Sequence, residues 1–304
     1  MRKIAGRRKV YRIAIYCMAA LAIWFPLLDG LAADAIYSPH PEVTRSVSAG
    51  HDTAFVFFTG TQSSAKALSA PMLTTWGAVG DVVAVEYPRN RFDDTAIVAD
   101  TLNQLCAWGY RKVILSGASL GGLVVADFID YNRQKGDQLQ IIAVLMEDVP
   151  TGSEDLVQAG GAQFMSWWHA GPLANLVLTR PFWATSFNPP PRNQLGKGVD
   201  EGQLRRQYEA SKTYPLSGWT DELRYMVNHR AFTPGEYTGI SLIILQSDKD
   251  EVVKPDAAIK WQSIFGGGHV IKTDSTHIGF VEYPEVWRTA FVEAFHQVGI
   301  HPIG

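Results

Sequence analysis

The fold of this chain is decided by one stretch, Lys112-Val113-Ile114-Leu115-Ser116-Gly117-Ala118-Ser119-Leu120-Gly121-Gly122. It begins with a short apolar run, typical of a buried strand, and continues with a G-x-S-x-G pattern over residues 117–121. Apolar residues at helical spacing then extend to Ile129. A strand, a tight turn and a helix together form the setting of a nucleophile elbow, in which the turn presents a serine hydroxyl.

The glycines of this pattern have a steric reason. The serine of an elbow lies in a strained turn, where side chains at Gly117 and Gly121 would collide with neighbouring backbone. The same turn directs backbone N–H groups at the start of the helix toward whatever Ser119 attacks. Because the pattern also fits a turn whose serine only caps the helix, the rest of the chain has to decide between the two readings.

Strands and helices alternate on both sides of this stretch. The sequence predicts buried strands at 54–58, 81–87, 140–146, 240–245 and 269–273. Helices are expected at 65–76, 93–108 and 285–297 and from Pro255 onward, whereas residues 35–50 are expected to form an irregular lead-in. This alternation favours an α/β protein with a mainly parallel central sheet flanked by helices.

The alternation breaks between Thr151 and Gly239. Helical pieces are expected there at 154–169, 201–212 and 219–230, together with tryptophans at 167, 168, 183 and 219. We interpret residues 151–239 as an inserted, largely helical cap over a core made of residues 34–150 and 240–304. Because caps and sheets meet where ligands bind, a few of the aromatic side chains in the cap should line a pocket.

The N-terminus has the three-part layout of a secretory signal peptide. Residues 1–12 include six basic and no acidic side chains, residues 13–28 form an apolar run, and small residues follow at 31–35. The apolar run is short for a membrane span, which needs about 20 residues, and Pro26 interrupts it. We therefore expect residues 1–33 to be a signal peptide, cleaved after Ala32, Ala33 or Ala35, and the protein to be exported to the periplasm or secreted. An uncleaved N-terminal anchor is the alternative.

Charge and motifs exclude several functional classes. Removing residues 1–33, with six basic residues and one acidic residue, would change the formal net charge from −3 to −8, which argues against nucleic acid as a partner. Membrane contact is expected only through an uncleaved N-terminal segment, and nothing in the sequence indicates the oligomeric state. The histidines lack metal-binding spacing, and the chain has neither a G-x-G-x-x-G motif nor a P-loop. We therefore expect no metal and no cofactor.

Two later loops complete a constellation with Ser119. The sequence D-K-D-E-V-V-K-P follows the predicted strand at 240–245, and T-H-I-G-F follows the last predicted strand. With these motifs and G-A-S-L-G-G, the chain resembles the α/β-hydrolase superfamily over about residues 50–298, without resembling one particular subfamily. The resemblance implies that Ser119 is the nucleophile, Asp250 the orienting acid and His277 the base, in the order this chemistry takes on that fold. Asp248 and Asp148 are alternative acids.

The resemblance also implies an oxyanion hole made of two backbone N–H groups. One should belong to Leu120, directly after the nucleophile. The other should come from the loop after the strand at 54–58, from Thr61 or alternatively from Gln62. That loop has Thr59-Gly60 where many members of the superfamily have His-Gly, so the identity of the second donor stays open.

Together these inferences predict an exported serine hydrolase that cleaves a carboxylic ester or related acyl bond through an acyl-enzyme. The apolar and aromatic cap favours an uncharged small-molecule or lipid-like acyl substrate. The alternatives are other reactions on the same fold, such as thioester, amide or carbon–carbon hydrolysis or perhydrolysis, and a non-catalytic binding protein.

Overall fold

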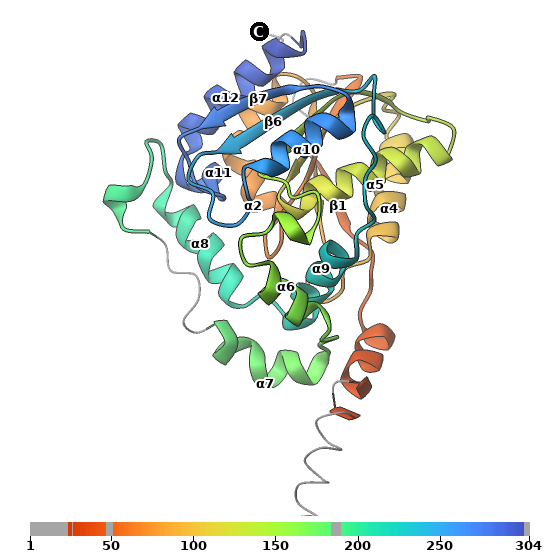
Figure 1. Ribbon diagram of the computed structural model, residues 1–304, viewed down its shortest axis with the longest axis vertical. Coiled ribbons are helices and arrows are strands. Elements are labelled where there is room, and N and C mark those ends of the chain that lie inside the picture. Colours follow the sequence, from red (N-terminus) through yellow and green to blue (C-terminus); the bar gives the residue numbers. More distant parts are fainter. Residues whose placement is uncertain (1–23, 26, 47–50, 184–189, 301–304) are drawn as a thin grey trace, which may run out of the picture.

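The computed structural model describes residues 24–25, 27–46, 51–183 and 190–300. Within these residues the chain forms a seven-stranded sheet in the order β1-β3-β2-β4-β5-β6-β7. Figure 1 labels three of its strands, β1, β6 and β7. All neighbouring strands are parallel except β1, which runs antiparallel to β3. The strands are β1 (Glu42–Ser46), β2 (Thr53–Phe58), β3 (Asp81–Glu86), β4 (Lys112–Ala118), β5 (Gln140–Glu147), β6 (Ser241–Ser247) and β7 (His269–Thr273).

Helices cover both faces of the sheet. The six residues of β2 are all buried, and they alternate between two hydrophobic clusters, with Val56 and Phe58 in one and Phe55 and Phe57 in the other. Helices α4, α5 and α10 pack in the first cluster, and α2, α3 and α12 in the second. The core helices are α2 (Ala65–Ser69), α3 (Leu73–Gly77), α4 (Asp94–Ala107), α5 (Leu120–Gln134), α10 (Asp256–Phe265), α11 (Gly279–Glu282) and α12 (Pro284–Gln297). The predicted α/β architecture, a mainly parallel sheet flanked by helices, is thus confirmed.

Two local expectations in the core were wrong. The expected irregular lead-in contains β1, which pairs with β3 alone and is half exposed, so that its polar sequence E-V-T-R-S lacks the apolar run of a buried strand. The single helix expected at 65–76 is interrupted by a 3₁₀ turn, η1 (Ala70–Met72). Pro71 has no N–H to donate to the preceding turn, which ends α2 at Ser69.

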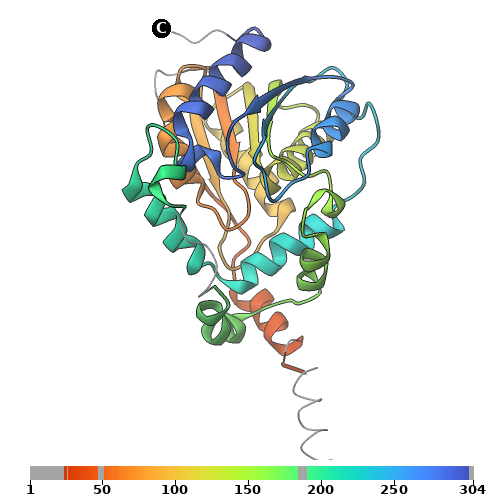
Figure 2. The ribbon, with the colours of Figure 1, turned by 60° about the vertical axis from the view of Figure 1, so that its left-hand side comes forward.

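The described part of the segment between β5 and β6 carries four helices: α6 (Ala159–Ser166), α7 (Pro172–Trp183), α8 (Glu201–Lys212) and α9 (Leu216–Asn228). Short 3₁₀ turns, η2 (Ser153–Asp155) and η3 (Arg192–Gln194), accompany them. These helices gather at the lower end of the molecule in Figure 1, and Figure 2 shows them there from a second direction. They meet the core at the loops that follow β2 and β3, where Glu222 contacts Gln62 and Gly218 lies against the backbone of Arg89.

The helix α7 was not expected from the sequence. Proline at its first position suits a helix start, but Pro181 lies inside it, and its apolar residues are largely exposed instead of forming one buried stripe. Residues 27–36 are also helical and pack against the beginning of α7. The remainder of the predicted signal peptide, residues 1–23 and 26, lies outside the described residues. No helix in the described part of the chain is long and apolar enough to cross a membrane.

Candidate active site

The turn between β4 and α5 has the geometry of a nucleophile elbow. Ser119 has φ 50° and ψ −124°, and its backbone N–H donates to the carbonyl oxygen of Glu147 at 2.8 Å. A Cβ atom on Gly117 would lie 2.6 Å from the backbone of Gly122, and one on Gly121 would lie 2.2 Å from the carbonyl oxygen of Phe58. The steric reason predicted for both glycines is confirmed. Only glycine lets the backbone of this turn approach its neighbours closely enough.

Residues with strained backbone conformations cluster after the carboxyl ends of the central strands, where Ser119 lies. Non-glycine residues rarely have positive φ, and such residues cluster at functional sites. Of the four described here, Ser119, Gln62 (φ 56°) and Asp148 (φ 49°) follow β4, β2 and β5, which are neighbours in the sheet. The fourth, Asp137, lies at the opposite end of the sheet, ahead of β5. This clustering marks the carboxyl edge of the central strands as the candidate site.

Two of the predicted triad residues are joined directly. The Nδ1 atom of His277 lies 2.9 Å from Oδ2 of Asp250. The other oxygen of Asp250 accepts hydrogen bonds from the N–H groups of Val252 and Val253 at 2.7 and 3.0 Å, which fixes the carboxylate in place. The carboxylate of Asp248, the alternative in the same loop, is half exposed and lies 3.8 Å from Nζ of Lys272. Of the two acids in D-K-D, only Asp250 therefore contacts the imidazole.

The protonation of His277 follows from these contacts. Burial by itself lowers the pKa of the imidazole, but the hydrogen bond and charge of Asp250, with the charge of Asp148, raise the pKa above its ordinary value of 6.5. A carboxylate can only accept, so Nδ1 carries the proton that it shares with Asp250. In the neutral ring Nε2 then has a free lone pair and is the atom able to take a proton from a substrate or a hydroxyl.

The other alternative acid, Asp148, has a different connection. Its two oxygens accept hydrogen bonds from the backbone N–H and the hydroxyl of Ser247, at 2.8 and 2.6 Å, and the Ser247 hydroxyl lies 2.9 Å from that of Ser275. Asp148 is 5% exposed, and this burial raises its pKa. The network connects the ends of β5 and β6 to the loop that carries His277. Asp148 therefore stabilises the position of that loop.

Asp148, Asp250 and His277 also form a possible metal-ligand group, since one ligand atom from each lies within 4.8 Å of the others. The carboxylate oxygens, however, are taken by backbone N–H and hydroxyl donors, and by Nδ1 of the imidazole. The hydrogen-bond network accounts for the proximity of the three side chains.

The predicted oxyanion donors come from the start of α5 and from the loop after β2. Leu120 is the first residue of α5, where a backbone N–H has no partner within the helix. The N–H of Gln62 donates to Oε2 of Glu222 at 3.2 Å. Its engagement leaves Thr61 as the candidate for the second donor. Gly60 makes the close approach possible, because a Cβ there would lie 3.0 Å from Cβ of Ser119.

Glu222 is a residue that the sequence analysis missed. It lies on α9, is 1% exposed, and accepts a second hydrogen bond, at 2.6 Å, from the hydroxyl of Tyr214. Burial raises the pKa of Glu222 to about 8, although the hydrogen bonds from Tyr214 and Gln62 work in the opposite direction. No motif surrounds this residue, and a glutamate on a helix normally faces water. The inserted segment thus places a buried acid with a raised pKa against the loop that holds Thr61.

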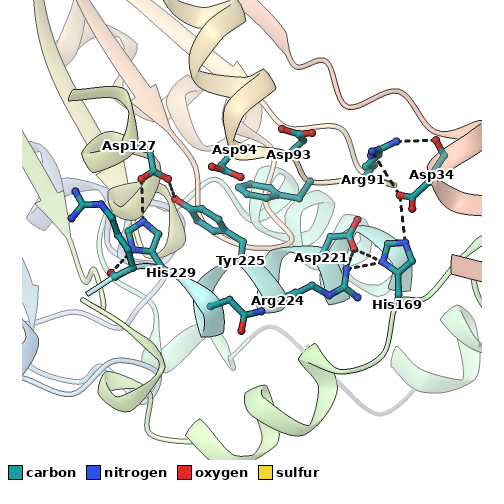
Figure 3. Close-up of a pocket in the computed structure, with 13 residues that line it drawn as sticks. Asp34, Arg91, Asp93, Asp94, Asp127, His169, Asp221, Arg224, Tyr225 and His229 are labelled. Carbon is teal, nitrogen blue, oxygen red and sulfur yellow. Dashed lines mark hydrogen bonds and ion pairs between the residues drawn. The ribbon is translucent and has the colours of Figure 1, made fainter. Parts of the chain in front are cut away.

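A polar pocket of about 530 Å³ lies apart from these residues, and its described lining includes none of the predicted triad (Figure 3). At one end Asp127 accepts a hydrogen bond from Tyr225 at 2.5 Å and lies 3.2 Å from Nε2 of His229. At the other end Asp221 contacts His169, at 3.1 Å. Acidic and basic side chains in this lining largely compensate one another. The lining consists of Asp34, Arg91, Phe92, Asp93, Asp94, Asp127, His169, Asp221, Arg224, Tyr225, Asn228, His229 and Arg230.

No protein-family model matches the sequence, and no curated protein matches it. Solved structures do resemble the fold. An enol-lactonase from Burkholderia xenovorans LB400 has a TM-score of 0.64 at 11% identity, with 84% of this chain and 96% of that chain covered. A mutant epoxide hydrolase from Bacillus megaterium has a TM-score of 0.62 at 10% identity, with 84% of this chain and 96% of that chain covered. A thermophilic esterase from Thermogutta terrifontis has a TM-score of 0.60 at 13% identity, with 85% of this chain and 94% of that chain covered. The chain has the α/β-hydrolase fold, as the sequence motifs indicated.

Proposed function

We propose that the protein is a serine hydrolase in which Ser119 is the nucleophile, His277 the general base and Asp250 the acid that orients the base. The observation that carries this proposal is the 2.9 Å contact between Nδ1 of His277 and Asp250. It occurs at the sheet edge where the strained turn presents Ser119, and β4, β5, β6 and β7 are consecutive there. Acyl transfer is the chemistry that needs these three groups together.

In the proposed reaction, Nε2 of His277 takes the proton of the Ser119 hydroxyl as its oxygen bonds to the carbonyl carbon of the substrate. The carbonyl oxygen becomes negatively charged, and the N–H groups of Leu120 and Thr61 stabilise it. The carbon–oxygen bond to the leaving group then breaks, and the proton on His277 passes to that group, which leaves an acyl-enzyme. Water repeats the sequence, with His277 as base, and releases the acid and the free serine.

We propose an ester as the substrate, with an uncharged small-molecule or lipid-like acyl group. Similar structures include proteins named as an esterase and an enol-lactonase, which agrees with this choice. Others are named as an epoxide hydrolase and a type II thioesterase, so the fold is compatible with several reactions. The proposal for an ester therefore depends on the serine at the elbow, and its test must include thioesters and amides.

The experiment combines a fluorophosphonate probe with turnover of p-nitrophenyl esters and of thioesters and amides with the same acyl groups. The wild-type protein should be labelled and active, Ser119→Ala should lose both properties, and Ser241→Ala, which alters an exposed serine at the start of β6, should keep both. Asp250→Ala should lose nearly all turnover, whereas Asp248→Ala should keep it. A wild-type protein that neither reacts with the probe nor hydrolyses any acyl substrate would show that the fold serves another purpose here.

A further inference from the structure

The helix formed by residues 27–36 is locked to the start of α7 by one buried carboxylate. Asp29 is 2% exposed, and its oxygens accept hydrogen bonds from the N–H groups of Gly171, Leu173 and Ala174 at 2.8, 2.8 and 3.0 Å. Gly171 directly precedes α7, and Leu173 and Ala174 lie in its first turn, where backbone N–H groups have no acceptor within the helix. Asp29 therefore acts as the cap of a helix that lies far away in the sequence.

Further contacts fasten the same segment. Ala33 is buried, and Gly171 packs so closely on Asp29 that a Cβ there would lie 1.9 Å from its carbonyl oxygen. Asp34 contacts Arg91 at 3.7 Å and His169 at 3.5 Å, as Figure 3 shows. Cleavage after Ala32 or Ala33 would remove Asp29 and leave the first-turn amides of α7 without their acceptor, and cleavage after Ala35 would do the same. The packing thus favours a segment that is retained.

The surface around this junction is unusually apolar. Trp167, Leu176 and Phe164 are 86%, 82% and 77% exposed. Large apolar side chains are also exposed on the neighbouring helix of residues 27–36 and on the rest of α7. Both helices lie at the lower end of the molecule in Figure 1. Many exposed large apolar side chains on neighbouring elements are typical of an interaction site. The other members are Trp24, Phe25, Leu27, Leu28, Leu31, Ile36, Leu173, Val177, Leu178 and Phe182, and we call the whole set the apolar face.

The sequence that leads into this face indicates what covers it. The apolar run of residues 13–28 continues directly into the helix at 27–36, and six basic residues precede it within residues 1–12. A basic flank followed by apolar residues suits a lipid bilayer, because the basic groups pair with lipid phosphates while the apolar side chains enter the acyl region. A chain that enters the bilayer at this point holds the apolar face next to the lipid.

We propose that the helix of residues 27–36 remains part of the folded protein and that the apolar face is seated on the surface of a lipid bilayer. This helix and α7 then form one unit, in which Asp29 holds the membrane-proximal helix to the inserted segment. The proposal does not depend on the catalytic assignment, because it concerns a surface that contains no residue of the proposed triad.

The first test is the mass of the exported protein isolated from cells. The intact mass should include Asp29, and a chain that begins at residue 33, 34 or 36 would overturn the proposal.

The second test places a fluorophore on the face of the full-length protein. With Cys17 and Cys106 replaced by alanine, Leu176→Cys and the matched control Ile259→Cys, which is 66% exposed on α10, are each labelled with an environment-sensitive dye. The proteins are reconstituted into phosphatidylethanolamine–phosphatidylglycerol vesicles that contain nitroxide-labelled lipid.

At position 176 the emission should shift to the blue and be quenched severalfold by the nitroxide lipid, whereas position 259 should remain unquenched. Unquenched emission at position 176 in vesicles would overturn the proposal. A blue shift without vesicles that grows with protein concentration would also overturn it, because it would show that a second copy of the chain covers the face. Turnover of a short soluble ester by the same samples reports separately on the active site.

Discussion

The buried acid Glu222 should make the stability of this protein fall as the pH rises. In the folded protein burial raises the pKa of Glu222 from 4.5 to about 8, so the folded state keeps the proton over a range where the unfolded chain has released it. The unfolded state then binds fewer protons than the folded state, and the free energy of unfolding decreases with pH between about 4.5 and 8. The destabilisation is absent below this range and complete above it.

Its size follows from the difference between the two pKa values. At about 1.4 kcal/mol per pKa unit, the rise to about 8 corresponds to roughly 5 kcal/mol of lost stability at high pH, as an order of magnitude. Glu222→Gln keeps the shape of the side chain and an oxygen that can accept from the N–H of Gln62, but it cannot ionise. The variant should match the parent near pH 4.5 and become the more stable protein above pH 8.

The measurement is denaturant-induced unfolding of both proteins at pH 5, 7 and 9, followed by far-ultraviolet circular dichroism. Other groups also titrate in this range, and the difference between the two proteins at each pH removes their common contribution. The stability gain of Glu222→Gln should grow by several kcal/mol from pH 5 to pH 9. A difference that stays constant across this range would refute the reasoning, since it would mean that Glu222 ionises normally in the folded state.

Three further predictions concern the elbow, the base and the N-terminal segment. Gly121→Ala drives a Cβ to 2.2 Å from a backbone oxygen at the end of β2 and should cost about 1–3 kcal/mol in thermal unfolding, whereas Gly161→Ala, with open space around it, should not destabilise. Because Asp250 raises the pKa of His277, kcat/KM for p-nitrophenyl acetate should increase with pH, and the midpoint of this increase should lie above pH 6.5. Asp250→Asn should move the midpoint to lower pH and reduce the rate by about 10⁴-fold. Asp29→Ala should lower the free energy of unfolding by about 1–2 kcal/mol and Asp29→Asn by less, whereas equal stability in all three proteins would mean that this segment is not docked.

The central sheet could be predicted because its signals are local. Each parallel strand is a short apolar run with turn residues at its ends, and burial on both faces produces that run, as in β2. The elbow was visible for the same reason, since Gly117 and Gly121 stand at fixed offsets from Ser119 and are required by contacts within and beside the turn. The edge strand β1 lacked such a signal, because it is buried against a single neighbour.

The inserted segment could be predicted only in outline, because its role depends on contacts between distant parts of the chain. Glutamates on helices usually face water, so Glu222 carries no sign in the sequence that it reaches Gln62, 160 residues away. The choice between Asp248 and Asp250 was a matter of loop geometry, which a two-residue spacing does not determine. The structure distinguishes these two acids by the hydrogen bonds of Asp250 to two amides of its own loop and to His277.

The N-terminal segment fits two predictions from the same sequence, a cleaved signal peptide and a retained structural element. Basic, apolar and small residues in that order describe composition, and the same composition suits a helix that leaves a membrane and docks on a protein. Asp29 is the residue that distinguishes a cleaved signal peptide from a retained helix. It is an acid within an apolar stretch, and in a cleaved signal peptide it would have no structural partner. Sequence-based prediction of a helix cap considers only the few residues around the helix start. The backbone amide of Gly171 that Asp29 binds is 142 residues away from Asp29 in the sequence, so this cap could not be predicted. Only the folded arrangement joins them, and it gives this acid a function that cleavage would abolish.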